Sequence, residues 1–312
     1  MRSLLIGRAL VCAAALLLGV SAPQSAAAAT SQPDYDAIAA RTFAQGKLPG
    51  MAVAIVRNGT IVFEKGYGDA NIAKNLPVSA ETPFAVGSLT KQFTAVSVLM
   101  LAARGKLKLD DPISKYVASL PNAQSITLRQ ALWQVSGLHN YPHPGEHDWP
   151  TAGEVAPQKL FALLATDNSD FPPGSRWAYS NTNYAVLARA VEIASGMPYA
   201  RFVEENIFKP LGMNESGYGF QAQSSLPLAT PYAGSRPFST YPAAWSLDVF
   251  YGAGGIVSSA HDMGLWMNGL LSRRLLDSEG LSQLWSAGRL SNGNAVSYAM
   301  GFVPTTMNGH RE

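Results

Sequence analysis

Cysteine is nearly absent from this sequence: the only one among 312 residues is Cys12. The chain after that position therefore has no disulfide, no thiol nucleophile and no thiolate ligand for a metal. Enzymes that attack their substrate with a cysteine are excluded.

An excess of charge of either sign is also missing. Residues 1–29 hold two of the 23 basic residues and no acidic one, so the rest of the chain carries 21 basic against 21 acidic residues. It contains no run of like charge. Binding to nucleic acid depends on clustered Lys and Arg, so no nucleic-acid partner is expected.

Long apolar runs are missing beyond the N-terminus. Arg2 and Arg8 flank the start of the apolar run Ala9–Val20, and Ala26–Ala29 offers small residues for cleavage. This pattern is typical of a secretory signal peptide, and the run is shorter than the about 20 apolar residues that a membrane span needs. We expect a signal peptide at 1–29, a secreted or periplasmic protein, and no stable membrane span.

The nucleophile motif Gly-x-Ser-x-Gly is absent too, and three of the five histidines, His139, His143 and His147, share one segment. Their spacing would align them on a helix, but the prolines and the glycine between them forbid a helix. We therefore expect no Ser-His-Asp triad, no metal site and no cofactor. The loop is instead expected to border the active site and to influence the choice of substrate.

Two segments have clear secondary-structure signals. Gly50–Arg57 and Thr60–Gly68 are β-type runs separated by Asn58-Gly59, the strongest short-range signal for a hairpin. Thr90–Arg104 repeats apolar residues at helical spacing, and Gly105 is placed to end that helix.

The rest of the chain favours helices joined by Pro- and Gly-rich loops. Near the end, Tyr298–Val303 has the pattern of a strand. Strands that enclose a large helical region predict an α+β fold in which a helical block is inserted into a sheet. The clearest helical patches are Leu160–Ala165, Tyr184–Ser195, Pro198–Phe208 and Asp262–Leu270.

Ser88 and Lys91 form the first candidate reactive pair. They lie three residues apart at the start of the predicted helix and so share one of its faces. A lysine amine held neutral can accept the serine proton, and the positive end of the helix stabilises negative charge on the serine oxygen. Taken alone, the pair is more typical of an ordinary N-cap serine than of a reactive site.

Tyr179 and Asn181 form the second candidate group. A phenol that is anionic or strongly hydrogen-bonded can relay protons between a serine oxygen and a leaving group. The amide of Asn181 can hold Lys91 and donate to a substrate carbonyl. Taken alone, this segment is equally typical of a turn that leads into the helix near Tyr184.

The two groups lie within Ala85–Ala95 and Pro172–Asn181. Together with four other segments, they resemble class C β-lactamase-like proteins of the serine β-lactamase and penicillin-binding-protein superfamily. The resemblance spans roughly residues 48 to 302, in order and at family-like spacing. The other similar segments are Gly105–Pro112, Ile126–Leu138, Pro210–Met213 and Gly254–Ser259.

The resemblance implies a role for each candidate residue. Ser88 would be the acylated nucleophile, Lys91 its base or proton acceptor, Tyr179 the proton relay, and Asn181 a contact of substrate and of Lys91. It also implies an antiparallel sheet flanked by helices with an inserted helical subdomain, at about 105–250. We expect one hydrolase domain over 30–312.

One element of the family is not found. Its third motif, Lys-Thr-Gly or His-x-Gly on a late strand, is absent, and Gly309-His310-Arg311 lacks the final glycine. We therefore do not expect His310 to be the motif histidine. The hypothesis is that the C-terminal strands are missing and the domain is incomplete.

The reaction implied is acyl transfer to Ser88 from an amide, a β-lactam or an ester, followed by hydrolysis. The partner would be a small molecule or a peptide, D-amino-acid peptides included. β-Lactamase is the first specific expectation, with D,D-peptidase and esterase as alternatives. A penicillin-binding sensor that is acylated without turnover, and an inactive fragment, also stay open.

Overall fold

The computed structural model describes residues 33–151, 153, 155–219, 226–234, 237–240, 246–307 and 310–311, and side chains up to residue 306. The chain divides into two units, Met1–Asp34 and Tyr35–Glu312, and the second contains all the described helices and strands. The signal peptide expected at 1–29 lies outside the described residues.

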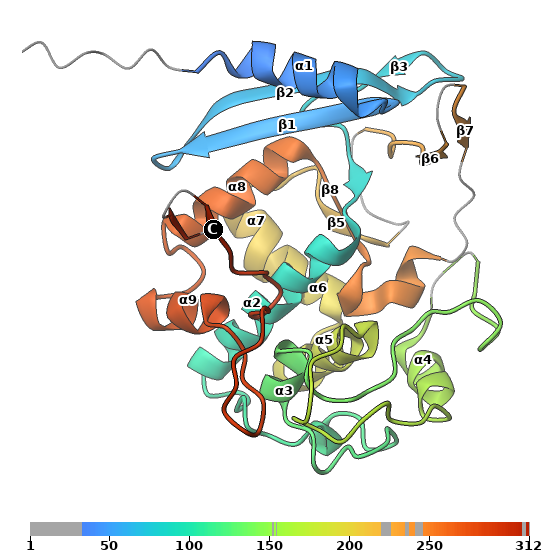
Figure 1. The fold of residues 1–312 in the computed structure, drawn as a ribbon, viewed down its shortest axis with the longest axis vertical. Coiled ribbons are helices and arrows are strands. Elements are labelled where there is room, and N and C mark those ends of the chain that lie inside the picture. Colours follow the sequence, from blue (N-terminus) through green and yellow to red (C-terminus); the bar gives the residue numbers. More distant parts are fainter. Residues whose placement is uncertain are drawn as a thin grey trace, which may run out of the picture. The chain divides into compact units, whose positions relative to one another are not determined.

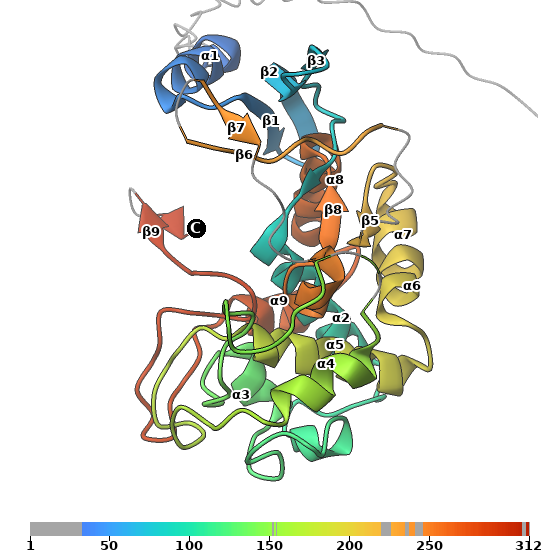
Figure 2. The same ribbon diagram turned by 90° about the vertical axis from the view of Figure 1, so that its right-hand side faces the viewer.

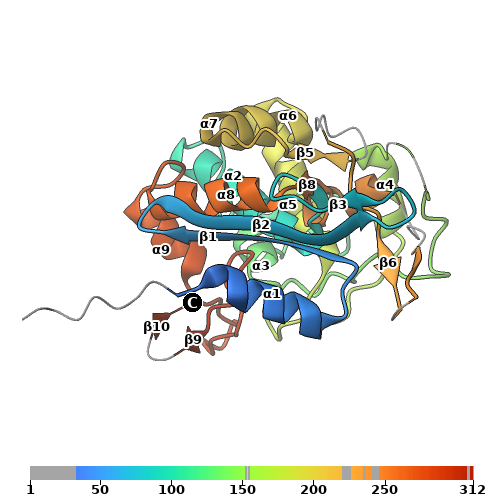
Figure 3. The same ribbon diagram turned by 90° about the horizontal axis from the view of Figure 1, so that it is seen from above.

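A hairpin sheet lies between two helices. Strand β1 (Gly50–Arg57) pairs antiparallel with β2 (Thr60–Asn71), which also pairs with the short β3 (Leu76–Pro77). Helix α1 (Tyr35–Gly46) covers one face of the hairpin and α8 (Ala260–Leu271) covers the other (Figure 1; Figure 3). At the turn both Asn58 and Gly59 have positive φ, 51° and 78°, as a two-residue hairpin turn requires.

A second small sheet connects the hairpin region to the helices (Figure 2). Its central strand β8 (Ile256–Ser258) pairs antiparallel with β4 (Phe84–Ala85) and with β5 (Gly217–Tyr218). Because β4 ends just before Ser88, this sheet fixes the approach of the chain to the candidate nucleophile. The remaining described strands form two-stranded pairs: β6 (Tyr232–Ala233) with β7 (Ser239–Thr240), and β9 (Thr306–Met307) with β10 (His310–Arg311).

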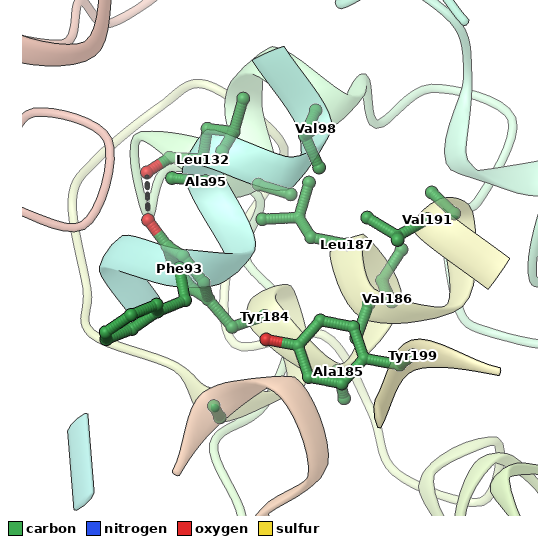
Figure 4. Packing of buried hydrophobic residues seen from close by; sticks show 14 of the residues in the cluster. Phe93, Ala95, Val98, Leu132, Tyr184, Ala185, Val186, Leu187, Val191 and Tyr199 are labelled. Atoms are coloured by element: carbon green, nitrogen blue, oxygen red, sulfur yellow. Dashed lines mark hydrogen bonds between the residues drawn. The ribbon is translucent and has the colours of Figure 1, made fainter. Parts of the chain in front are cut away.

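Helix α2 (Thr90–Ala103) runs through the core. Most of its residues are buried, and its apolar residues from Phe93 to Leu101 all belong to the core. It packs against α5 (Asn181–Ser195), and the hydroxyl of Tyr184 donates to the carbonyl of Leu132 over 3.0 Å (Figure 4). The other described α-helices are α3 (Leu128–Leu132), α4 (Pro157–Leu164), α6 (Tyr199–Val203), α7 (Lys209–Leu211) and α9 (Ser278–Trp285).

The α+β prediction is confirmed, as are the hairpin and the helix that ends before Gly105. The prediction of a strand at Tyr298–Val303 is wrong. There Gly301 has a φ of +83°, and the backbone N–H of Met300 donates to the carbonyl of Leu284, so the segment is a loop against the core. None of the described helices is both long and apolar enough to cross a membrane.

Candidate active site

Ser88 and Lys91 lie where the chain enters α2. Ser88 is in a 3-10 turn, Gly87–Leu89, that continues into α2 at Thr90. Lys91 Nζ lies 3.2 Å from Ser88 Oγ, and the lysine is 1% exposed. The predicted one-turn pairing is thus present, and the lysine side chain is directed inward toward the serine oxygen.

Two carbonyl oxygens bind the amine of Lys91. Nζ donates to Asn181 Oδ1 and to the backbone oxygen of Ala253, each over 2.8 Å. Burial lowers the pKa of Lys91 from 10.5 to about 7, because the charged form loses its hydration. In a neutral amine, the two N–H bonds would serve the two carbonyls, which can only accept, and the lone pair would face Ser88 Oγ.

The phenol of Tyr179 reaches the same serine. Its oxygen lies 2.6 Å from Ser88 Oγ, while Lys91 Nζ lies 4.6 Å from the centroid of its ring. Burial raises the pKa of Tyr179, and the hydrogen bond to Ser88 offsets part of that rise. The phenol is therefore protonated near neutral pH, which favours a strongly hydrogen-bonded relay over an anionic one.

Asn181 begins α5 and is bound from three directions. Its Oδ1 accepts from Lys91, its Nδ2 donates to the carbonyl of Tyr141 over 2.6 Å, and its backbone N–H donates to Asn140 Oδ1 over 2.8 Å. These partners fix which side of the amide faces Lys91. Among the residues that the structure describes, these partners use one of the two side-chain N–H groups. The second N–H is placed to make the contact with substrate that was expected.

Buried Gln134 supports the Tyr179–Asn181 segment and was not singled out from the sequence. Its Oε1 accepts from the backbone N–H of Ser180 over 3.0 Å and from Asn183 Nδ2 over 2.6 Å. Its own carbonyl accepts from the N–H of Ala178. The position of Tyr179 therefore depends on a side chain far away in the sequence.

The carbonyl of Ala253 was also missed. Tyr251 has φ 43° and ψ −131°, a strained conformation for a residue with a side chain. Beyond this bend, the carbonyl of Gly252 accepts from Thr94 Oγ1 and that of Ala253 accepts from Lys91. A Cβ on Gly252 would lie 2.7 Å from the carbonyl oxygen of Tyr184, so only glycine allows this approach to α2 and α5.

The loop that carries His139, His143 and His147 contacts the first turn of α5. The carbonyl of His139 accepts from the hydroxyls of Ser180 and Thr182. Its ring is held by Asp170, 2.8 Å from Nδ1, and this hydrogen bond raises the pKa of the imidazole. His147 is turned elsewhere and pairs with Asp167 over 2.9 Å.

A family model described as Beta-lactamase matches residues 35–306. The chain belongs to the beta-lactamase family. This places it in the superfamily of β-lactamase and penicillin-binding-protein relatives that the motifs predicted. The match includes both segments that carry the geometry above.

Curated relatives in this family have varied names. The chain is 32% identical over 258 residues to PbpX of Bacillus subtilis (strain 168), named as a penicillin-binding protein. The aligned region covers 82% of this chain and 63% of that protein. It is 32% identical over 286 residues to the D-alanyl-D-alanine-carboxypeptidase/endopeptidase AmpH of Escherichia coli (strain K12), with 87% and 70% covered. The chain thus spans about three fifths of the first of these relatives.

Solved structures agree on the fold. A D-stereospecific amidohydrolase from Streptomyces sp. has a TM-score of 0.71 at 26% identity, covering 89% of this chain and 86% of its own. A D-amino acid amidase from Ochrobactrum anthropi has a TM-score of 0.73 at 22% identity, covering 87% and 80%. The second similarity concerns the fold alone.

Proposed function

We propose that this chain is an exported serine hydrolase that is acylated at Ser88. The observation that carries the proposal is the position of Ser88 Oγ, 3.2 Å from the amine of Lys91 and 2.6 Å from the phenol of Tyr179. A serine hydroxyl is a weak nucleophile unless a base is within hydrogen-bond reach. Here a buried lysine supplies that base, since its pKa of about 7 leaves a substantial neutral fraction near pH 7.

In the acylation step, Lys91 Nζ takes the proton of Ser88 as Oγ attacks the substrate carbonyl. The tetrahedral intermediate collapses, the bond from carbon to the leaving nitrogen or oxygen breaks, and the Tyr179 hydroxyl gives its proton to the leaving group. The proton held by Lys91 then restores the phenol. In deacylation, a water molecule attacks the acyl carbonyl while the same side chains take its proton. The bond from the acyl carbon to Ser88 Oγ then breaks, and the proton returns to Oγ.

Asn181 would act on both partners of this step. Its Oδ1 orients the amine of Lys91, and its second N–H is the group proposed to bind a carbonyl oxygen of the substrate. Leu89 and Trp177, which neighbour Ser88 and Tyr179 in the sequence, are 44% and 43% exposed. If these exposed apolar side chains contact the substrate, they suit one with an apolar group next to its scissile bond.

The names of the relatives guide the choice of substrate. AmpH is named as a D-alanyl-D-alanine carboxypeptidase/endopeptidase and the Streptomyces protein as a D-stereospecific amidohydrolase. We therefore place peptides and amides of D-amino acids first, with esters and β-lactams as further acyl donors. The signal peptide proposed at 1–29 would deliver the enzyme outside the cytoplasm, where cell-wall peptides of this kind occur.

The test is mass spectrometry of the intact protein after exposure to a D-alanyl amide, a p-nitrophenyl ester and a penicillin. A transient adduct with product release is the expected result for at least one of them, and Ser88→Ala abolishes it. A lasting adduct with the penicillin and no turnover of any compound would mean that the protein is a penicillin-binding sensor and not a hydrolase. No adduct on a folded protein would overturn Ser88 as nucleophile.

A further inference from the structure

The loop that follows Leu138 gathers three groups of a kind that bind transition metals. One ligand atom each from His139, His143 and Glu146 lie within 4.8 Å of one another. No metal site was predicted here from the sequence, because the prolines and the glycine prevent a helix that would align the histidines. The bent loop brings two imidazoles and a carboxylate together without a helix.

The distances suit a small divalent ion. His139 Nε2 lies 3.3 Å from Glu146 Oε1. Two ligands bound tetrahedrally to Zn²⁺ at about 2.0–2.1 Å would lie about 3.3 Å apart. The His143 ring would have to approach the other two by at most roughly 1.5 Å, a movement that side-chain rotation can supply.

The surroundings of His139 resemble the outer shell of a metal site. Its Nδ1 lies 2.8 Å from Asp170 Oδ1, which leaves Nε2 to face Glu146. Metal-binding histidines almost always have their second ring nitrogen held in this way by a carboxylate, a carbonyl or water. Asp170 is itself fixed, since its backbone N–H donates to the carbonyl of Gly137 over 2.8 Å.

The rest of the loop is anchored around this cluster. The ring of Trp149, 7% exposed, lies 5.3 Å from the buried ring of Tyr141, and its Nε1 donates to the carbonyl of His143. His147 is bound to Asp167 on the other side. The cluster therefore lies on a loop held at both ends, while the side chains of His139 and Glu146 are 31% and 37% exposed.

We propose that His139, His143 and Glu146 bind one divalent transition-metal ion of the zinc class. Two imidazoles and one carboxylate suit Zn²⁺ and its neighbours better than Mg²⁺ or Ca²⁺, which prefer oxygen ligands. Three protein ligands leave at least one coordination position for water.

The site would bear on the proposed hydrolase centre through Asn140. Asn140 Nδ2 lies 3.4 Å from His143 Nε2, and Oδ1 of the same amide accepts from the backbone N–H of Asn181. An ion that draws His143 toward His139 therefore acts on the side chain that holds Asn181, which in turn binds Lys91. This second step rests on the proposed function, whereas binding of the ion does not.

The test uses the tag-free full chain, treated with a chelator, dialysed and titrated with Zn²⁺ in a calorimeter. We expect one equivalent to bind and the thermal midpoint to rise with Zn²⁺ concentration. His143→Ala and Glu146→Gln each weaken binding at least tenfold, and Glu146→Gln removes the carboxylate at an exposed position while keeping the size of the side chain. His261→Ala, which alters a half-exposed histidine paired with Glu64, keeps the affinity of the original chain.

Ser88→Ala separates this proposal from the hydrolase. It should bind Zn²⁺ as the original chain does, so a failure of acyl chemistry leaves the metal result intact. No binding, or equal binding by Glu146→Gln, His143→Ala and the original chain, would overturn the site. Mg²⁺ binding as tightly as Zn²⁺ would overturn the assignment to the zinc class.

Discussion

The amine of Lys91 donates to the backbone oxygen of Ala253 over 2.8 Å, across 162 residues of sequence. Together with Asn181 Oδ1, this carbonyl occupies two of the directions in which the amine can donate. The remaining direction faces Ser88. The same carbonyls would also bind a protonated amine, so the pKa of about 7 caused by burial decides how much base is present.

The first prediction concerns the pH dependence of hydrolysis. If neutral Lys91 is the base, kcat/KM rises about tenfold per pH unit below pH 7 and levels off above about 7, where the amine has lost its proton. The measurement is kcat/KM for a p-nitrophenyl ester between pH 5 and 9, corrected for the spontaneous reaction. A rate that is flat or falls over the acidic limb would contradict a lysine base with this pKa.

The second prediction concerns stability, measured as the free energy of unfolding in urea. Because the folded-state pKa of Lys91 is below 10.5, the unfolded chain binds more protons between about pH 7 and 10.5. Stability supplied through this group therefore rises with pH across that window, by up to about 1.4 kcal/mol per pH unit. Lys91→Met removes that rise.

The comparison that matters is the difference between Lys91→Met and the original chain as a function of pH. The free energy of unfolding of Lys91→Met, relative to that of the original chain, should be highest below pH 7 and should fall as pH rises to 10.5. Lys106→Met, a change at an exposed lysine, is the control and should give a difference that does not vary with pH. A constant difference for Lys91→Met as well would mean that burial does not lower this pKa.

The third prediction concerns the relay. Tyr179→Phe removes the hydroxyl that lies 2.6 Å from Ser88 Oγ and keeps the ring beside Lys91. We expect kcat to fall by about 10²–10⁴-fold, the usual size of a general acid–base contribution, with KM little changed. Tyr67→Phe, at a tyrosine on β2 that binds Asp36, should leave both constants unaltered. Equal kinetics for the two variants would remove Tyr179 from the mechanism.

The sequence predicted those parts of the molecule that depend on neighbouring residues. The hairpin follows from Asn58-Gly59, whose residues tolerate positive φ, and the Ser88–Lys91 pair follows from helical geometry. The proximity of Tyr179 came from a family resemblance, since no local periodicity relates it to Ser88. Its oxygen is nevertheless within hydrogen-bond distance of the serine.

What the sequence missed depends on backbone and tertiary contacts. The carbonyl of Ala253 has no residue-type signal, because every residue has a carbonyl and only the bend at Tyr251 directs this one at Lys91. Helix α1 also was not predicted. The prediction of a strand at Tyr298–Val303 failed because a strand-like run of apolar residues does not reveal that Gly301 adopts a left-handed conformation against α2.

The last prediction concerns the buried amide that positions the relay. Gln134→Leu removes the oxygen that accepts from the Ser180 N–H and from Asn183 Nδ2. Both buried donors then lose this hydrogen bond. An unsatisfied buried donor costs about 1–3 kcal/mol, so the free energy of unfolding should fall by about 2–6 kcal/mol. Where the protein stays folded, kcat should fall more than KM changes, because Tyr179 and Asn181 lose their fixed positions relative to Ser88.

Gln134→Glu separates the hydrogen bonds from side-chain size, since a carboxylate oxygen can still accept from both donors. We expect it to retain more activity than Gln134→Leu despite the cost of a buried charge. Gln283→Leu, on the exposed face of α9, should change neither stability nor kinetics by a comparable amount. If Gln134→Leu unfolds like the original chain and hydrolyses at the same rate, Gln134 has no part in holding the Tyr179–Asn181 segment.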